Sequence, residues 1–455
     1  MRVKKVFNYS VFLAAVLAVN HAYSAVSPDD AQRLKTDLTP LGAERAGNAQ
    51  GTIPAWTGGF TQAIDGEVKG GRRGDPFKDE KPLFTITAAN AAEYADKLTD
   101  GTQAMLAKYP DSYRLDVYTT HRTAAAPEWV YENTAKNATT ATLKNNGAII
   151  EGAFGGIPFP IPQSGAEIMW NHNLRWRGES TQVQSRQYQL LASGKAVLVT
   201  DLKADVEMPY YFQDSSLEEY SKRNEFWMMR SSTSAPAMRA GEALVGRANN
   251  DADKGQAWVY LTGQRRIRKL PNICCDTPSP TMGGIASFDE IEGFTGRLDR
   301  FDWSIVGKQE FYIPYNGNKL MQPSSDEAVL SAHHLNPDHV RWELHRVWVV
   351  EANLRQGQRH QAPKNRYYCD EDTWICVLGD RWDAKGQLWK TTWAQTAIIA
   401  ELPALVLVSY GLNDLISGDA FVGGLYNSKQ SQYGVLPRFP ASTFTPDALM
   451  AEGVR

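Results

Sequence analysis

The sequence predicts a mainly antiparallel β protein with helices, of the α+β class, whose sheet forms a large, curved and incompletely closed β-barrel. Strand-like runs recur from about residue 180 and are separated by turn residues, which favours an antiparallel meander over βαβ units. Several runs are long: residues 339–351 would span about 43 Å at about 3.3 Å per residue, and long bent strands suit a barrel. The predicted strands are 183–191, 195–202, 256–262, 308–313, 339–351, 365–378, 386–399 and 404–411.

The first 24 residues have the parts of a secretory signal peptide. Arg2, Lys4 and Lys5 form a basic start, residues 11–19 form a short apolar run, and small residues precede a cleavage site after Ser24. The apolar run is too short to span a bilayer, no cysteine follows it to carry a lipid anchor, and no later stretch reaches the length of a membrane span. We therefore expect a soluble periplasmic protein, free or peripheral to the outer membrane.

Between the signal peptide and the barrel we expect an extended arm. Residues 25–80 are rich in Gly, Pro and polar residues and predict a segment that lies on the body without strands. Residues 81–455 are then expected to form a single barrel-like domain with helical insertions. Helices are predicted in residues 88–109, 124–143, 165–175 and within 215–250, whereas the Gly/Pro loop 147–165 cannot be a central strand.

Charge argues against nucleic acid as a partner. The 455-residue chain has 48 Lys and Arg against 51 Asp and Glu, a formal charge of −3. Removal of residues 1–24 takes away three positive charges and no acid, which makes the mature charge −6. An exported, mildly acidic protein is a poor nucleic-acid binder, despite the basic stripe that follows the strand at 256–262.

Four cysteines are consistent with export, because disulfides form in oxidising compartments. Cys369 and Cys376 flank a short hairpin that a bridge could close, and Cys274 and Cys275 are adjacent. Four cysteines allow three connectivities, and the sequence does not choose among them. The spacing fits no zinc-binding pattern.

Aromatic residues on strand faces are candidates for the wall of an apolar cavity. The chain has 13 Trp, and their alternative role is ordinary sheet packing. In the run 339–351, one face carries Trp342, Leu344 and Trp348, and in 386–399 Trp389 and Trp393 share a face. Aromatic and aliphatic walls with few polar groups are what a hydrophobic ligand requires.

Motifs of catalysis and metal binding are not recognisable, so the sequence predicts no catalytic residue, no metal and no cofactor. No G-x-S-x-G, H-E-x-x-H, Walker or G-x-G-x-x-G string occurs. His333, His334 and His339 are interpreted as loop and strand-start residues. The acidic run Asp370 to Asp372 could serve acid–base chemistry or calcium, but is interpreted as a solvated turn.

Several long segments resemble one family. They are WVYLTGQRRIRKLPN (258–272), FDWSIVGKQEFYIPYN (301–316), YYCDEDTWICVLGDRWDAKGQLWKT (367–391) and AERAGNAQGTIPAWTGG (43–59). Together they resemble DUF1329, an exported bacterial family of unknown function, over nearly the whole mature chain. That family is similar in fold to the Lol-type carriers that sort outer-membrane lipoproteins, which are unclosed curved barrels plugged by helices. The four cysteines depart from the expected pattern, and a disulfide at 369–376 would oppose a mechanism in which that hairpin opens.

The resemblance implies a cavity wall and its entrance. Either Trp258 and Tyr260, or their neighbours Val259 and Leu261, would line the cavity together with Phe311 and the aromatic faces named above. Arg265, Arg266, Arg268 and Lys269 would hold a lipid head group or dock an acidic partner. A basic edge that discourages strand addition is the alternative. Family members are often encoded beside resistance-nodulation-division-type transporters and an outer-membrane protein, which implies such partners.

The resulting hypothesis is a periplasmic carrier that binds a lipid or other hydrophobic molecule and moves it within the cell envelope without covalent chemistry. The alternative is a non-catalytic accessory protein that bridges an inner-membrane transporter to the outer membrane. A lumen filled by the loop 147–165 would favour this alternative. A third reading is an envelope hydrolase that uses His339, Asp370 or Asp372.

Overall fold

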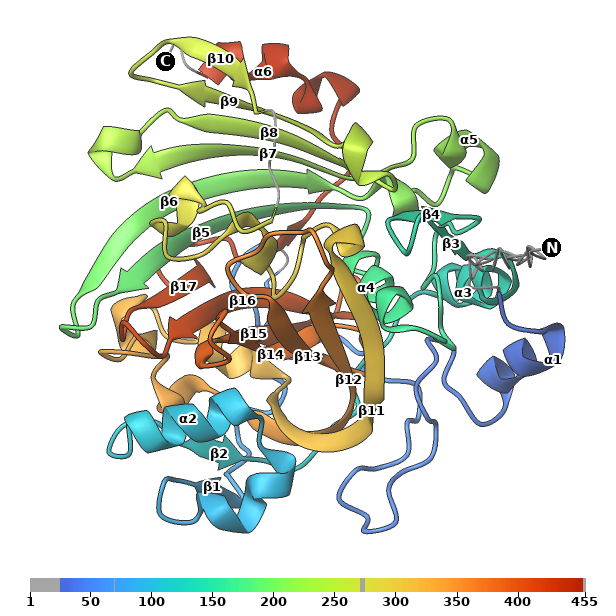
Figure 1. Cartoon of the computed structure of the whole chain (residues 1–455), viewed down its shortest axis with the longest axis vertical. Helices are drawn as coiled ribbons and strands as arrows, with labels where there is room; N and C mark the ends of the chain where they lie inside the picture. The colour runs from blue at the N-terminus through green and yellow to red at the C-terminus, as the bar shows by residue number, and fades with distance from the viewer. Residues whose placement is uncertain (1–24, 69, 271–274, 453–455) are drawn as a thin grey trace, which may run out of the picture.

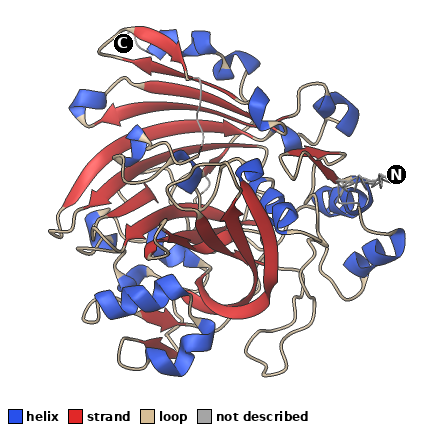
Figure 2. Cartoon of the chain, in the orientation of Figure 1, coloured by secondary structure: helices blue, strands red, loops and turns tan. Residues whose placement is uncertain are grey.

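The structure, a computed structural model, describes residues 25–68, 70–270 and 275–452 (Figure 1). The predicted signal peptide, residues 1–24, lies outside the described residues. Within the described ranges, no helix has both the length and the apolar character needed to cross a membrane. Strands form the centre of the fold, and short helices and loops surround them (Figure 2).

One sheet of 16 strands organises the described chain. Its main path is an antiparallel meander. Because β17 pairs with β5, the strands of the C-terminal half of the chain, β11 to β17, lie on one side of β5 and the strands β6 to β10 lie on the other. From edge to edge the path runs through β11 (Phe301–Pro314), β12 (Trp342–Leu354), β13 (Lys364–Asp370), β14 (Cys376–Trp382), β15 (Leu388–Ile399), β16 (Ala404–Asp414), β17 (Ala420–Leu425), β5 (Ser180–Leu190), β6 (Ala196–Glu207), β7 (Glu225–Ala235), β8 (Ala243–Asn249), β9 (Gln256–Leu261) and β10 (Arg266–Lys269).

The remaining strands are short. β1 (Phe84–Ile86) pairs with β2 (Leu115–Val117), and β2 meets the start of β12 through one parallel pair. β18 (Gly434–Val435) pairs with β5, and β3 (Thr142–Lys144) forms a separate hairpin with β4 (Ile149–Glu151). The mainly antiparallel character predicted from the sequence is confirmed. Closure into a barrel is not, because the strand order among the described residues does not return to its start.

The helix predicted within 215–250 is largely wrong. This segment contains α5 (Leu217–Ser221) and a short 3-10 helix (Ala237–Arg239), and most of it forms β7 and β8, which lie between β6 and β9 in the sheet. The Met and Ala residues of the segment favour a helix locally. Pairing with β6 and β9 overrides that preference, because strand formation depends strongly on neighbouring strands.

Helices α2, α3 and α4 lie close to where the sequence predicts them, whereas α1 and α6 were not predicted. α2 and α4 begin at side-chain caps, in which the hydroxyls of Thr99 and Ser164 accept hydrogen bonds from the backbone N–H groups of Thr102 and Glu167. The helices are α1 (Pro28–Ala31), α2 (Asp100–Lys108), α3 (Glu128–Thr140), α4 (Gly165–Asn173) and α6 (Pro446–Glu452).

The sheet has two parts, β11 to β17 and β5 to β10, and helix α4 lies between them (Figure 1). It packs against β11 and β12 on one side, and its Trp170 contacts Phe226 of β7 on the other, with ring centroids 6.1 Å apart. All nine residues of α4 are buried. The preceding loop contributes Phe154, Ile157 and Phe159 to the same cluster of buried apolar side chains. This helix and loop fill the space between the two parts of the sheet at this level.

The segment 25–80 precedes the first strand and is anchored to distant parts of the chain. Arg73 is fully buried, forms ion pairs with Glu67 and Glu401, and donates its backbone N–H to the Gln432 side chain. The indole N–H of Trp56 donates to the carbonyl of Ala124. The segment therefore lies on the body of the protein over long stretches of irregular backbone.

Candidate ligand-binding face

Strand β9 presents two different faces, and alternation assigns its residues to them. Trp258 and Tyr260 lie on one face, where Tyr260 packs with Val245 of β8 and Leu449 of α6. Tyr260 and Leu449 are buried, and Lys269 lies over the Trp258 ring at 5.7 Å from its centroid. Helix α6 packs on this face of β8, β9 and β10. Trp258 and Tyr260 are therefore packed beneath a helix.

The opposite face of β9 carries Val259 and Leu261, and strand pairing extends it across five strands. Val259 is opposite Leu244 of β8. Gly246, two residues farther along β8 and on the same face, is opposite Met229 of β7. The larger apolar side chains on this face are half-buried, whereas Ala204 and Ala257 are buried. We call this surface the apolar face; its members are Val183, Leu202, Val206, Trp227, Met229, Leu244, Val259 and Leu261.

The apolar face meets the buried interior at one end. Val183, Phe226 and Trp227 pack against the cluster that contains the side chains of α4. Trp170 of α4 is itself fixed, because its indole N–H donates to the carbonyl of Gly147 at 2.8 Å. The apolar face therefore extends from the cluster around Trp170 of α4 to β9, which lies next to the edge strand β10.

Two basic side chains border the apolar face at that edge. Arg266 is opposite Leu261 and Arg268 is opposite Val259, so both arginines lie on the same face as these apolar residues. Both are exposed. Lys269 is opposite Trp258 and belongs to the other face, and Arg265 lies in the turn with a positive φ of 49°. Of the four predicted head-group residues, Arg266 and Arg268 adjoin the apolar face.

Comparison with known proteins decides the family. The model of the family described as "Protein of unknown function (DUF1329)" matches residues 85–450. A Pseudomonas aeruginosa protein described as uncharacterized is 38% identical over 466 residues, and the alignment covers 100% of both chains. The chain belongs to the DUF1329 family. The resemblance predicted from its motifs is confirmed.

Solved structures similar to this DUF1329 chain share little sequence with it. A domain of Vibrio parahaemolyticus described as an outer-membrane lipoprotein-sorting protein has 11% identity and a TM-score of 0.43, over 63% of this chain and 98% of that one. A DUF1329 protein of Desulfovibrio piger has 13% identity and a TM-score of 0.40, over 63% and 97%. A LolA superfamily protein of Nitrosomonas europaea has 14% identity and a TM-score of 0.36, over 63% and 100%.

The remaining predicted wall residues of this DUF1329 protein lie away from the apolar face. Phe311, Trp342 and Leu344 are buried in a second apolar cluster, against which Trp393 packs. A pocket beside Trp342 and Trp393 has a volume of about 30 Å³, which is room for about one water molecule. These side chains form a filled core.

Trp348 and Trp389 are separate from that cluster. Trp348 packs against the cluster that contains α4, and Lys308 lies over its ring at 4.6 Å. Trp389 is half-buried and donates its indole N–H to Asp414. The structure therefore brings together Phe311, Trp342, Leu344 and Trp393 in one cluster. Trp258 and Tyr260 belong to a separate cluster.

Sequence reasoning missed six of the eight members of the apolar face. Val183 and Leu202 lie in predicted strands but were not assigned to a cavity wall. Trp227 and Met229 lie in the segment predicted to be helical, and so does Leu244. Val206 lies beyond the predicted end of its strand at residue 202. Residues 226–229 are all apolar, so the sequence around Trp227 and Met229 has no alternation that would indicate a half-buried strand.

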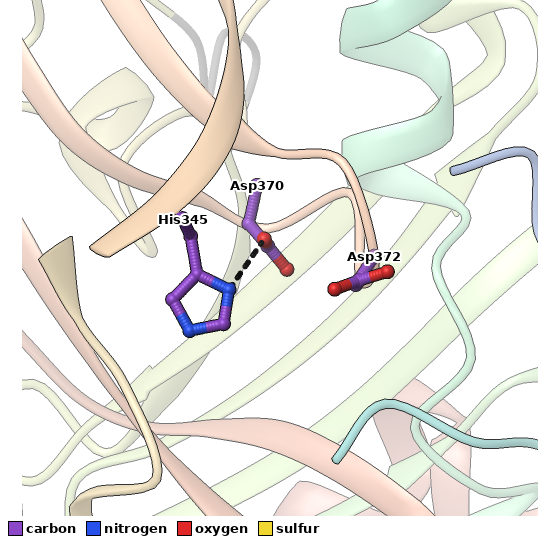
Figure 3. A group of neighbouring side chains, drawn as sticks. All are labelled: His345, Asp370 and Asp372. Atoms are coloured by element: carbon purple, nitrogen blue, oxygen red, sulfur yellow. Dashed lines mark ion pairs between the residues drawn. The ribbon is translucent and has the colours of Figure 1, made fainter. Parts of the chain in front are cut away.

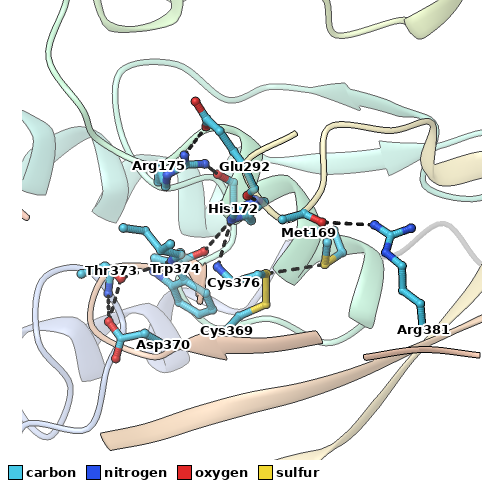
Figure 4. The surroundings of a disulfide bond; sticks show 12 residues. Met169, His172, Arg175, Glu292, Cys369, Asp370, Thr373, Trp374, Cys376 and Arg381 are labelled. Atoms are coloured by element: carbon cyan, nitrogen blue, oxygen red, sulfur yellow. Dashed lines mark hydrogen bonds and ion pairs between the residues drawn. A yellow bond between two sulfur atoms is a disulfide. The ribbon is translucent and has the colours of Figure 1, made fainter. Parts of the chain in front are cut away.

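The predicted bridge between Cys369 and Cys376 is present (Figure 4). It closes the hairpin between β13 and β14 next to helix α4, where the backbone N–H of Cys376 donates to His172 Nδ1 at 3.0 Å. Burial, and then the charge of Arg175, lower the pKa of His172 to about 3, so the imidazole is neutral. Cys274 lies outside the described residues, and the predicted Cys274–Cys275 pair is not described.

The acidic run of the same hairpin is not a solvated turn, and that interpretation is wrong. Asp370, Glu371 and Asp372 are 0%, 2% and 2% exposed. Arg122 binds both oxygens of Asp372, and Arg346 binds Glu371. The run is buried because cationic side chains from distant segments cover it.

The predicted histidines have separate environments. His334 is buried and interacts with the Leu335 carbonyl and the Ser112 hydroxyl. His339 ends a short 3-10 helix before β12. The imidazole that lies near Asp370 and Asp372 belongs to His345 of β12.

Proposed function

We propose that this protein binds a lipid or another hydrophobic molecule on the apolar face and moves it within the cell envelope without covalent chemistry. The observation that carries this proposal is the set of half-buried apolar side chains that share one face of the sheet, from Val183 on β5 to Leu261 on β9, with Ala204 and Ser231 between Val183 and Leu244. Contiguous apolar surface of this kind on a folded protein is typical of a binding site.

The energetics are sufficient for a carrier. Burial of each methylene group of an acyl chain contributes about 0.8 kcal/mol. Ten methylenes therefore give a micromolar dissociation constant after the entropic costs of association. Affinity in this range allows both loading and release, which a carrier requires.

The charge at the rim suggests the chemistry of the ligand. Arg266 and Arg268 are exposed beside Leu261 and Val259, and guanidinium groups bind carboxylates and phosphates with paired hydrogen bonds. We infer an amphiphile with an anionic head group at β10 and its apolar tail along β9, β8 and β7.

We also propose that the sheet forms an unclosed barrel and that the protein acts in the periplasm. The meander between edges β11 and β10, with α4 at its centre, is consistent with an unclosed, curved barrel plugged by a helix. The predicted signal peptide supports a periplasmic site of action. In this role the protein is non-catalytic and uses no cofactor.

Ligand binding tests the proposal directly. The protein is purified from its own periplasm, and native mass spectrometry and organic extraction are expected to reveal a co-purifying apolar mass. A fluorescent fatty acid should bind the delipidated protein. Leu244→Gln and Val259→Gln should weaken this binding, whereas Ile416→Gln should not, because Ile416 is 52% exposed in the turn between β16 and β17. A clean apo mass and no fatty-acid binding would exclude the carrier role.

One observation favours a second function, in which the protein bridges an inner-membrane transporter to the outer membrane. Phe154, Ile157 and Phe159 of the loop before α4 are buried, as is the whole of α4, so the interior at this level holds the protein's own side chains. For a bridging protein, a tagged copy should retain a resistance-nodulation-division-type transporter from solubilised envelopes. Extraction of the same sample should yield no apolar ligand.

A further inference from the structure

A buried cluster of metal-binding side chains lies at the disulfide-closed hairpin, away from the apolar face. His345 projects from β12, Asp370 ends β13, and Asp372 lies in the turn that follows (Figure 3). One ligand atom from each of the three residues lies within 4.8 Å of the others. All three side chains are at most 2% exposed.

The hydrogen bonds of His345 leave its Nδ1 atom with a free lone pair. Its Nε2 lies 3.1 Å from Oε2 of Glu343. The other oxygen of Glu343, Oε1, accepts from Arg341 Nε at 2.5 Å and so forms an ion pair with this guanidinium. An ionised carboxylate only accepts, so Nε2 carries the proton. Metal-binding histidines in proteins have this arrangement, in which a carboxylate holds the far ring nitrogen.

Asp370 offers an oxygen that faces this lone pair and has no hydrogen-bond partner. Its Oδ2 accepts from the backbone N–H and the hydroxyl of Thr373, at 2.9 and 2.7 Å. Its buried Oδ1 has no partner and lies 3.9 Å from His345 Nδ1. That separation is too long for a hydrogen bond. It suits two ligands of one ion, each at about 2.0–2.2 Å from it.

The hydroxyl of Tyr315 is a second unpartnered group at the cluster. Its ring stacks on the His345 ring with centroids 3.8 Å apart, the residue is 0% exposed, and its hydroxyl has no hydrogen-bond partner. Tyr315 therefore lies directly against the imidazole of the cluster and carries a buried oxygen without a hydrogen-bond partner.

Carboxyl groups outnumber lysine and arginine side chains around the cluster. Arg122 binds both oxygens of Asp372, but each carboxylate oxygen has a second lone pair. The connected ion pairs contain six carboxyl groups and four Lys or Arg side chains, together with the imidazoles of His121 and His345. The acidic and the Lys or Arg residues are Glu44, Glu80, Glu343, Asp370, Glu371 and Asp372 with Arg122, Lys308, Arg341 and Arg346.

Covalent and hydrogen-bonded constraints hold the ligand atoms in place. The Cys369–Cys376 disulfide closes the hairpin that carries Asp370 and Asp372 (Figure 4). The indole N–H of Trp374, at the tip, donates to the carbonyl of Leu41 in the N-terminal segment. Such constraints favour metal binding, because the positions of the ligand atoms are set before the ion binds.

We propose that His345, Asp370 and Asp372 bind one divalent transition-metal cation, with the hydroxyl of Tyr315 available as a further oxygen ligand. A mixed imidazole and carboxylate set favours Zn²⁺ or Mn²⁺ over Ca²⁺, which prefers oxygen alone. The bound ion joins β12 to the β13–β14 hairpin. Its role is structural, since the ligands are buried and the disulfide limits movement.

Metal titration of the full mature chain tests this site. Protein with the disulfide intact is treated with a chelator, and Zn²⁺ and Mn²⁺ are then added in a calorimeter. We expect one equivalent of at least one of these ions to bind and to raise the melting temperature. Addition of Co²⁺ should give visible absorption bands from a nitrogen and oxygen ligand field. If the wild-type protein binds neither Zn²⁺ nor Mn²⁺, the proposal is wrong.

Two matched variants locate the ion. Asp370→Asn should weaken binding at least tenfold and remove the Co²⁺ bands. Asp380→Asn is the control, because Asp380 is also a fully buried carboxylate, on the neighbouring strand β14, and it instead accepts from the Gly101 N–H and the Tyr368 hydroxyl. Equal affinities in the two variants would place the ion elsewhere. If Asp370→Asn does not fold, the ¹⁵N resonance of His345 Nδ1 in the wild-type protein decides, because Zn²⁺ must shift it.

Discussion

The two parts of the same sheet are covered very differently. Strands β14 and β17 bury almost every side chain, whereas no residue of β7 is fully buried. Loops, α2, α4 and the N-terminal segment pack on the strands from β11 to β17, but the apolar face of β6 to β9 receives no comparable cover from the described residues. Both parts are antiparallel and hydrogen-bonded in the same way, so the surrounding segments determine which part is fully buried, here called the scaffold, and which is left half-buried.

Removal of one tryptophan from each part tests this comparison with the largest effect. Trp374 is 0% exposed, and Trp374→Ala should reduce the free energy of unfolding by about 3–5 kcal/mol, as expected for a large buried side chain. Trp227 on β7 is half-buried, and Trp227→Ala should cost only about 1.5 kcal/mol. Urea unfolding measures both; equal losses would mean that the two parts are equally packed.

Loss of the disulfide should affect the scaffold next. The bond closes a loop of about eight residues, so replacing both Cys369 and Cys376 with Ala should cost about 2–3 kcal/mol through the entropy of the unfolded chain. Fatty-acid binding by the folded double variant should be unchanged, because the hairpin does not contribute to the apolar face. Denaturant titration and fluorescence binding together report both effects. A loss of binding in a folded variant would connect the two parts.

The scaffold should also respond to pH through Asp380. Burial raises the pKa of Asp380 to about 7, more than the hydrogen bond from the Gly101 N–H lowers it. Between the ordinary pKa of an aspartate and about 7, Asp380 is therefore protonated in the folded protein but ionised in the unfolded chain. Stability is greatest below this window and falls as the pH rises through it, by up to about 1.4 kcal/mol per pH unit. Asp380→Asn should flatten this part of the stability curve, and an unchanged slope would contradict the assignment.

The smallest expected effect is on the apolar face itself. Leu244→Gln should leave the melting temperature within a few degrees of the wild type, because Leu244 is half-buried on a face without cover. Fatty-acid affinity should fall three- to tenfold, about 0.7–1.4 kcal/mol, as part of one side chain's apolar contact is lost. A large loss of stability with unchanged binding would reverse the roles assigned to the two parts.

The sequence predicted the strands of the scaffold better than the binding face. The long runs that became β12, β15 and β16 have strong local signals, and the Cys369–Cys376 hairpin is also local. The choice between Trp258 and Val259 depends on which face a helix covers, and that helix, α6, lies near the end of the chain. A period of two assigns residues to opposite faces but does not indicate which face is buried.

The metal-binding cluster was only partly visible in the sequence for a related reason. Asp370 and Asp372 were noticed as an acidic run, but their burial depends on Arg122 and on backbone near Leu41, which lie 250 or more residues away in the chain. His345 is a single histidine in a strand, without a motif. Such a cluster forms only when distant segments pack together, so spacing in the sequence cannot predict it.

The pairing of β17 with β5 has a consequence for how the chain folds. Val422 is opposite Tyr188, so this pairing joins residues more than 230 positions apart. A chain made from its N-terminus exposes the long edge of β5 until residue 425 has been synthesised, and unpaired strand edges attract other strands. Contacts between residues so distant in sequence form slowly. The sheet is thus completed late, and the newly made chain has its greatest need for a chaperone just before its last strands emerge.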